Sequence, residues 1–130
     1  MEGSPIESTS LRPATEDDLA AVVHIENHVH LAPWTEDNFR AEMAKPYSHF
    51  LLLTDDETDS KIAGYIIFWL MFDECQIMNV VVDLPYRGLG YAKKMIRQAA
   101  TLAAKKGIRK ILLDVRKANQ PAIQLYQSLQ

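Results

Sequence analysis

The residues best suited to chemistry in this sequence form a short glycine turn, Arg87-Gly88-Leu89-Gly90-Tyr91-Ala92. An apolar run before the turn, Ile77 to Val82, is typical of a buried strand, and an amphipathic run after it, Tyr91 to Lys106, predicts a helix. Glycines permit the positive φ angles that let successive N–H groups point inward, and a helix adds roughly half a positive charge at its first turn. The arrangement therefore predicts a site for a phosphate or pyrophosphate.

The spacing of the turn narrows the kind of phosphate ligand. A nucleotide P-loop needs Gly-Lys-Ser/Thr, whereas Gly90 is followed by Tyr91 and Ala92. A dinucleotide fingerprint needs a third small residue where this sequence has Lys93. The pattern that remains is Arg-x-x-Gly-x-Ala. For these six residues taken alone, the alternative to a phosphate-binding site is an ordinary turn from a strand to a helix.

This turn resembles the acyl-CoA pyrophosphate loop of the GNAT superfamily of N-acetyltransferases, and the resemblance covers about residues 11 to 130. Two further segments carry it. A segment similar to the fifth strand and final helix of the superfamily contains Asp114-Val115-Arg116, Asn119, Ala122, Ile123 and Tyr126. A segment similar to the N-terminal half of the RimI-type ribosomal-protein N-terminal-alanine acetyltransferases contains His24-Ile25-Glu26, Pro33-Trp34-Thr35-Glu36 and Phe39.

The resemblance implies acetyl-CoA as the acetyl donor. The pyrophosphate would be held by the glycine turn and the start of the following helix, at Arg87, Gly88, Leu89, Gly90, Tyr91, Ala92 and Lys93. The pantetheine arm would pair with the backbone of Val80, Val81 and Val82, where two parallel strands diverge. Asn119 would hydrogen-bond the pantetheine end, or, on its pattern alone, cap the last helix.

Transfer from a thioester to an amine requires a deprotonated amine, a stabilised oxyanion and a protonated leaving thiolate. The resemblance makes Tyr126 the acid, although its pattern alone is that of a core residue. Asp114 is the candidate base where RimI-type enzymes carry glutamate, and otherwise is a charge at a strand end. Glu26 and Trp34 are expected to position the acceptor. No metal site is expected, since His24 and His28 have only Glu26 nearby and it faces another way.

The elements that must position these residues follow from hydrophobic patterning. A helix is expected from about 16 to 27, and Thr35 is expected to cap a second helix. Strands are expected at Ser48–Thr54, Lys61–Met71 and Glu74–Asp83, and their short connections make them antiparallel.

After the third strand the order changes to strand, helix, strand. A helix over 91–106 ends at Gly107 and leads to a strand, Ile108–Val115, which should lie parallel to the strand that ends at Asp83. A last helix would begin near Asn119. The predicted fold class is α/β (α+β) of the GNAT type, with antiparallel N-terminal strands and a splayed parallel pair in one mixed sheet flanked by helices.

Length and composition indicate one domain. The chain has 130 residues, of which 48% are hydrophobic and 24% charged, and a net charge of −3 gives no basic footprint for nucleic acid. Residues 1–10 are expected to be a disordered leader and 11–130 a single N-acetyltransferase domain. No apolar run approaches a membrane span, and the single cysteine, Cys75, excludes an intramolecular disulfide, which fits a cytoplasmic protein.

RimI-type chains continue through two more strands after the final helix, so the resemblance implies that this sequence is shortened at its C-terminus. The strand over 108–115 would then present an open edge through which a homodimer could form. The expected function is acetyl transfer to an amine, foremost the N-terminal α-amine of a protein or peptide such as a ribosomal protein. The alternatives are a small-molecule amine acetyltransferase and a non-catalytic acyl-CoA-binding remnant.

Overall fold

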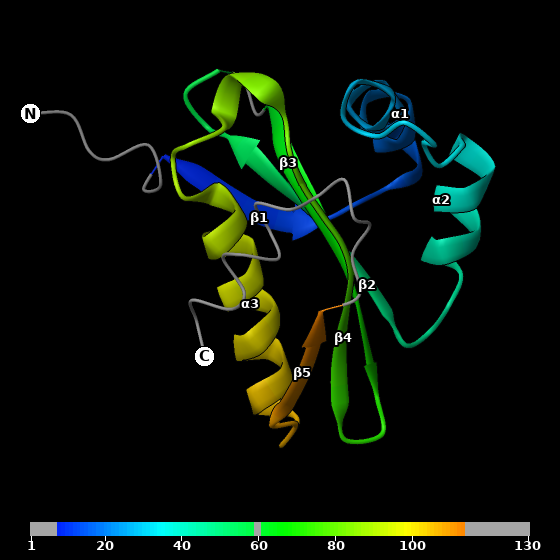
Figure 1. Cartoon of the computed structure of the whole chain (residues 1–130), viewed down its shortest axis with the longest axis vertical. Coiled ribbons are helices and arrows are strands. Elements are labelled where there is room, and N and C mark those ends of the chain that lie inside the picture. Colours follow the sequence, from blue (N-terminus) through cyan, green and yellow to red (C-terminus); the bar gives the residue numbers. More distant parts are fainter. Residues whose placement is uncertain (1–7, 59–60, 114–130) are drawn as a thin grey trace, which may run out of the picture.

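A computed structural model describes residues 8–58 and 61–113 of the chain. In this part a five-stranded sheet, ordered β1-β2-β3-β4-β5, lies between α3 on one face and α1 and α2 on the other (Figure 1). The strands are β1 (Thr9–Pro13), β2 (Ser48–Asp55), β3 (Lys61–Met71), β4 (Glu74–Val82) and β5 (Lys110–Leu113). The helices are α1 (Leu19–Val29), α2 (Glu36–Met43) and α3 (Tyr91–Lys105), with short 3₁₀ turns at Glu16–Asp18 and Leu84–Tyr86.

The strand directions confirm the predicted mixed sheet. Strands β1 to β4 pair antiparallel in chain order, and β5 pairs parallel to β4 after the crossover through α3. The described β4–β5 pairing runs from Glu74↔Lys110 to Ile77↔Leu113. Beyond Ile77, β4 has no described partner on its β5 side, although it stays paired with β3 as far as Val82.

Most element boundaries lie close to those predicted. The bounds of β3 are the predicted ones, and those of β2, β4 and α3 differ by one residue. The predicted first helix begins as a 3₁₀ turn at Glu16 and becomes α1 only at Leu19. The predicted last helix lies outside the described residues.

Strand β1 was not predicted from the sequence. Its five residues have no clear apolar alternation, and they become a strand by pairing with β2, from Thr9↔Asp55 to Pro13↔Leu51. Thr9 and Ser10 therefore belong to the sheet, although the sequence analysis assigned them to the leader.

Each face of the sheet packs into its own hydrophobic core, because alternate residues of a strand point to opposite faces. The core under α3 includes Ile66, Phe68, Ile77, Val80, Met95 and Ile96. The core under α1 and α2 includes Leu19, Val22, Phe39, Tyr65, Ile67 and Val81. None of the described helices is long and apolar enough to cross a membrane.

A reciprocal cap fixes the start of α2, as the sequence predicted for Thr35. The Asn38 N–H donates to the Thr35 hydroxyl oxygen at 3.2 Å, and the Thr35 N–H donates to the Asn38 side-chain oxygen at 3.0 Å. Such a cap satisfies two backbone donors that a helix leaves open at its first turn. It also sets the direction in which the preceding residue, Trp34, enters α2.

Candidate active site

The glycine turn between β4 and α3 has the geometry that its sequence predicts. Gly88 and Gly90 have φ angles of 79° and 85°, and Gly90 is the N-cap of α3. Residues 87–90 are exposed, and a Cβ built on Gly88 would meet nothing within 4 Å. An exposed turn of this kind at a helix N-terminus can receive the phosphates of coenzyme A.

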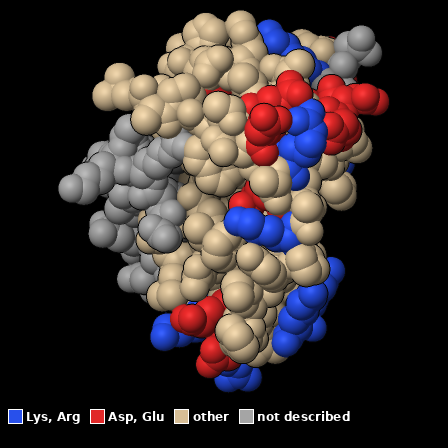
Figure 2. All heavy atoms as spheres, turned by 90° about the vertical axis from the view of Figure 1, so that its right-hand side faces the viewer, with Lys and Arg blue, Asp and Glu red and all other residues tan. Residues whose placement is uncertain are grey.

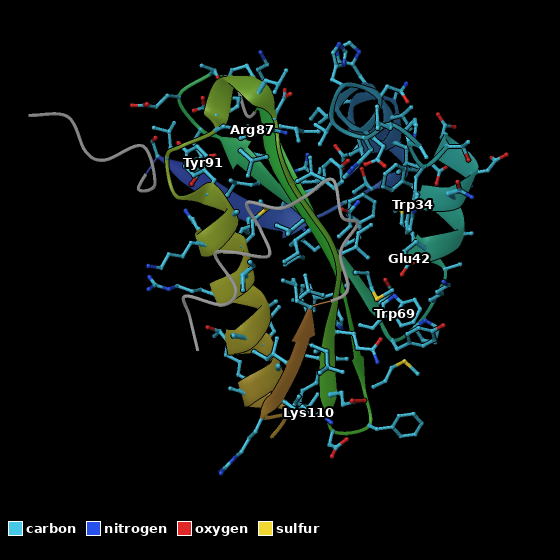
Figure 3. The ribbon with its side chains drawn as sticks, in the orientation of Figure 1. Trp34, Glu42, Trp69, Arg87, Tyr91 and Lys110 are labelled. Atoms are coloured by element: carbon cyan, nitrogen blue, oxygen red, sulfur yellow. The ribbon has the colours of Figure 1, made fainter. Side chains whose placement is uncertain are left out.

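The turn is held in place from both sides (Figure 3). The Arg87 side chain donates from Nε to the carbonyl oxygen of Val82 at 3.1 Å, which closes the segment between the strand and the turn. Tyr91 is only 3% exposed and packs against Tyr86, with ring centroids 6.1 Å apart. Because the Tyr91 ring is part of the core, only the backbone of Tyr91 could contribute to the expected cofactor binding.

A contact missed by sequence analysis fixes the first turn of α3 to the far edge of the sheet. The Lys94 ammonium group donates to the carbonyl oxygen of Thr9 at 2.8 Å and to its hydroxyl at 2.7 Å. Burial lowers the pKa of Lys94, and the nearby Asp56 opposes this effect. No sequence signal could have shown this contact, because it joins residues 85 positions apart.

The three valines before the turn divide between the two cores. Val80 and Val81 are 1% and 2% exposed and pack on opposite faces of the sheet, and Val82 is half-buried. Their side chains are therefore committed to packing, and what this segment can offer a ligand is its main chain.

Glu26 lies in the core on the opposite face and not on the surface. Its side chain has no exposed area, and one carboxylate oxygen accepts a 3.0 Å hydrogen bond from the backbone N–H of Trp34. The other oxygen accepts from the Tyr65 hydroxyl and lies 3.7 Å from Nε2 of His30. Glu26 thus fixes the segment between α1 and α2 to the sheet.

Trp34 is half-buried at the end of that segment. Its ring packs on Phe39, with centroids 5.2 Å apart and planes tilted by 56°. The residues before it, Leu31 to Pro33, are exposed. The segment that carries Trp34 is therefore fixed to the core through Glu26, while its apolar residues before Trp34 stay accessible.

A second buried carboxylate, Glu42, was missed by sequence analysis. It is 3% exposed and accepts hydrogen bonds from the Ser48 hydroxyl at 2.6 Å, from Lys45 at 3.0 Å and from the indole N–H of Trp69 (Figure 3). Burial by itself would raise the pKa of Glu42, but these three hydrogen bonds outweigh burial and lower it. The cluster ties α2 to β2 and β3.

Charges of both signs are mixed on the face formed by α1 and α2 (Figure 2). Arg40 illustrates the mixing, since it contacts Glu36 at 2.6 Å and Asp37 at 2.9 Å.

The single thiol, that of Cys75, is buried, and burial raises its pKa to about 11, which makes it a poor nucleophile. The described residues contain no group of three or more His, Cys, Asp or Glu side chains that could hold a metal ion.

The remaining predicted site residues, Asp114, Asn119 and Tyr126, lie outside the described residues. The structure therefore places the glycine turn and the valines together at one end of β4. Trp34 lies on the α1 and α2 side of the sheet, away from the glycine turn (Figure 3), and it packs against the same core as Val81. Glu26 lies on this side too, because it binds Tyr65 and the Trp34 backbone.

Comparison with known proteins identifies the family to which the chain belongs. The sequence profile of the acetyltransferase (GNAT) family matches residues 19–130. The chain belongs to the GNAT family of acetyltransferases. It is an N-acetyltransferase, and members of this family use acetyl-CoA as the acetyl donor.

The relatives confirm the predicted resemblance to the RimI-type branch. A putative ribosomal protein bS18-alanine N-acetyltransferase of Bacillus subtilis is 36% identical over 112 residues, which cover 85% of this chain and 72% of the relative. The ribosomal protein bS18-alanine N-acetyltransferase of Escherichia coli K12 is 32% identical over 112 residues, covering 86% and 73%.

Solved structures agree on the fold. The crystal structure of the ribosomal-protein-S18-alanine N-acetyltransferase from Escherichia coli superimposes with a TM-score of 0.79 at 29% identity, covering 93% of this chain and 76% of that chain. Ard1 from Thermoplasma volcanium gives a TM-score of 0.80 at 18% identity, covering 94% and 81%, which shows a shared fold.

Proposed function

We propose that this N-acetyltransferase moves the acetyl group of acetyl-CoA to the N-terminal α-amine of a protein, by direct attack in a ternary complex. The observation that carries the proposal is the exposed turn with left-handed Gly88 and Gly90 at the start of α3. Relatives that share the family and at least 30% of the sequence are named as alanine N-acetyltransferases of ribosomal protein bS18.

Coenzyme A would bind along one path from β4 to α3. The pyrophosphate would lie on the turn and on the first residues of α3, from Arg87 to Lys93, and the pantetheine amides would bind the main chain of Val80 to Val82. Asn119 would bind the pantetheine end. This path is supported by the exposure of the turn and by the commitment of the valine side chains to the two cores.

The chemistry would rest on two residues beyond β5. Tyr126 would protonate the leaving thiolate, because a phenol with a pKa near 10 can donate to a thiolate whose acid has a pKa of about 8.5. Asp114 would accept the proton of the amine, through a water molecule because aspartate is one methylene shorter than the glutamate of RimI-type enzymes. The buried Cys75 gives no reason to invoke a covalent acyl-enzyme.

The acceptor would enter from the side of α1 and α2. Trp34 would contact it directly, and Glu26 would act through Trp34, because its carboxylate is buried against the Trp34 backbone. An α-amine with a pKa near 8 is about 10% neutral at pH 7, whereas a lysine side chain near 10.4 is about 0.04% neutral. An α-amine therefore makes the smaller demand on a base.

A panel of acceptors tests the proposal. The chain is incubated with acetyl-CoA and peptides that differ in their first residue, peptides with a blocked N-terminus and an internal lysine, and small amines, and products are identified by mass spectrometry. The expected product is acetylated on the α-amine of an unblocked peptide. Modification of small amines alone would favour a small-molecule acetyltransferase, and coenzyme A binding with no product would favour a non-catalytic acyl-CoA-binding protein.

A further inference from the structure

The side chain of Asn79 in β4 is buried without the hydrogen bonds that an amide normally makes. Asn79 is 2% exposed, and neither its Nδ2 nor its Oδ1 has a hydrogen-bond partner among the residues that the structure describes. Buried polar side chains in native proteins are nearly always paired, so an unpaired one requires an explanation. A site that awaits a ligand is one such explanation.

Several other buried polar side chains of the described chain make hydrogen bonds. Glu42 accepts from Ser48 at 2.6 Å, and the Thr54 hydroxyl donates to the carbonyl oxygen of Ser10 at 3.4 Å. Glu26 accepts from the Trp34 backbone at 3.0 Å. The contrast shows that this fold can satisfy polar groups in its core, which it does not do for the Asn79 amide among the described residues.

Asn79 lies at an irregularity of the sheet. Ile67 of β3 pairs with Asn79 and the next residue, Phe68, pairs with Ile77, so Met78 is an additional residue in β4. Such bulges redirect side chains and are common beside active sites. The last described pair between β4 and β5 is Ile77↔Leu113, so Asn79 lies two residues beyond it.

The register also fixes the face on which Asn79 lies. Directly paired residues share a face, and its partner Ile67 belongs to the core under α1 and α2, together with Tyr65. Tyr65 donates to Glu26, which in turn holds the Trp34 segment. Asn79 thus lies on the proposed acceptor side, in the strand whose main chain is proposed to bind the cofactor.

The chemistry of the amide selects the kind of group it would bind. Nδ2 is a donor and Oδ1 an acceptor, and both are available together. A peptide group offers a complementary C=O and N–H, whereas a thioester carbonyl only accepts and an ammonium group only donates. The pantetheine amides offer the same pair of groups, but they are proposed to bind the main chain of Val80 to Val82. We propose that Asn79 positions the acceptor by hydrogen-bonding the first peptide group of the polypeptide chain that is acetylated. This inference rests on the proposed N-terminal acetyl transfer, and it makes Asn79 a residue that selects polypeptide acceptors.

The experiment compares Asn79→Leu, which keeps the approximate volume and removes the polar atoms, with Thr54→Val as the matched control. Both variants remove buried polar atoms, but only Thr54 has a hydrogen bond to lose. Thermal unfolding, coenzyme A binding and steady-state kinetics are measured on the whole chain. The acceptors are an alanine-initiated peptide and the same peptide with its first peptide N–H replaced by an ester oxygen.

We expect Asn79→Leu to unfold at or above the wild-type temperature, while Thr54→Val unfolds about 2–5 °C lower. With the peptide, Asn79→Leu should lose about tenfold or more in kcat/KM with an unchanged KM for acetyl-CoA, and Thr54→Val should retain the wild-type value. The wild type should prefer the peptide to the ester analogue, and Asn79→Leu should lose this preference. A purely structural role of Asn79 would not change that preference.

Two results would overturn the inference alone. One is a fall in the unfolding temperature of Asn79→Leu as large as that of Thr54→Val, since the amide would then have a structural partner. The other is wild-type kcat/KM and wild-type discrimination in Asn79→Leu while the wild type acetylates peptides. Acetylation of small amines but of no peptide by the wild type would instead overturn the proposed function, and the inference with it.

Discussion

The backbone N–H of Trp34 donates a 3.0 Å hydrogen bond to the buried carboxylate of Glu26, eight residues earlier in the chain. The same carboxylate accepts from the Tyr65 hydroxyl, so a single side chain joins α1, the segment before α2 and the centre of β3. The proposed contribution of Glu26 to acceptor binding would therefore act through the Trp34 segment.

Replacing Glu26 should reduce both stability and acceptor binding. In Glu26→Gln one of the two donors, the Trp34 N–H or the Tyr65 hydroxyl, faces an amide NH₂, and we expect a loss of about 1–3 kcal/mol in the free energy of unfolding. KM for the peptide should rise while KM for acetyl-CoA stays unchanged. Denaturant unfolding and steady-state kinetics measure these effects.

Glu36→Gln is the matched control, because the Glu36 side chain is 50% exposed and pairs with Arg40 at the surface. This variant should remain within about 0.5 kcal/mol of the wild type. Equal effects of the two substitutions would show that the buried carboxylate has no special role.

Gly90→Val should weaken coenzyme A binding on the order of tenfold or more. Gly90 has a φ angle of 85°, which a β-branched residue adopts only under strain, and the new side chain would also stand at the proposed pyrophosphate position. Isothermal titration calorimetry with coenzyme A measures the change.

Gly107→Val controls for backbone strain, because Gly107 has a φ angle of 78° at the other end of α3. It should lose stability and keep the affinity for coenzyme A. Wild-type affinity in Gly90→Val, or ATP competing better than coenzyme A, would contradict the proposed binding site.

Stability should fall in acid as the contact between Arg12 and Asp18 is lost. Two guanidinium nitrogens donate to the two Asp18 carboxylate oxygens at 2.9 Å, and this contact, opposed by burial, lowers the pKa of Asp18 from 3.8 to about 2. A carboxylate with a depressed folded-state pKa stabilises the protein fully above its unfolded pKa. That stabilisation is lost as the pH falls from about 4 toward 2.

Asp18→Asn should therefore flatten the pH dependence of the free energy of unfolding in this window, measured by urea unfolding at several pH values. Asp37→Asn serves as the comparison, because the Asp37 side chain is 93% exposed. It should keep the wild-type slope. Identical slopes for all three proteins would remove Asp18 as a source of the acid response.

Tyr126→Phe should lower kcat on the order of 100-fold, the effect typical of losing a general acid, with little change in coenzyme A affinity. Single-turnover kinetics and calorimetry separate the two quantities. A wild-type rate in this variant would exclude Tyr126 from the chemistry. In Asp114→Asn, an unchanged acidic limb of the pH–rate profile would likewise exclude Asp114 as the base.

The sequence by itself determined those features that depend on neighbours a few residues apart. Apolar runs separated by short turns predicted β2, β3 and β4, and helical spacing predicted α3. The two glycines of the turn predicted its left-handed geometry, and Thr35 was predicted to cap α2. The helix between β4 and β5 predicted their parallel pairing, because such crossovers follow one rule of handedness and direction.

The tertiary structure decided which side chains are buried together. Strand β1 exists through its pairing with β2, more than 35 residues away, and no local pattern announces it. Glu26 meets Tyr65 across 39 residues, and Glu42 meets Trp69 across 27. The bulge at Met78 arises from the register of two assembled strands, and next to it lies Asn79, whose side-chain amide has no hydrogen-bond partner among the described residues. Such contacts depend on the packing of distant segments, whereas sequence patterns report only the local preferences of the backbone.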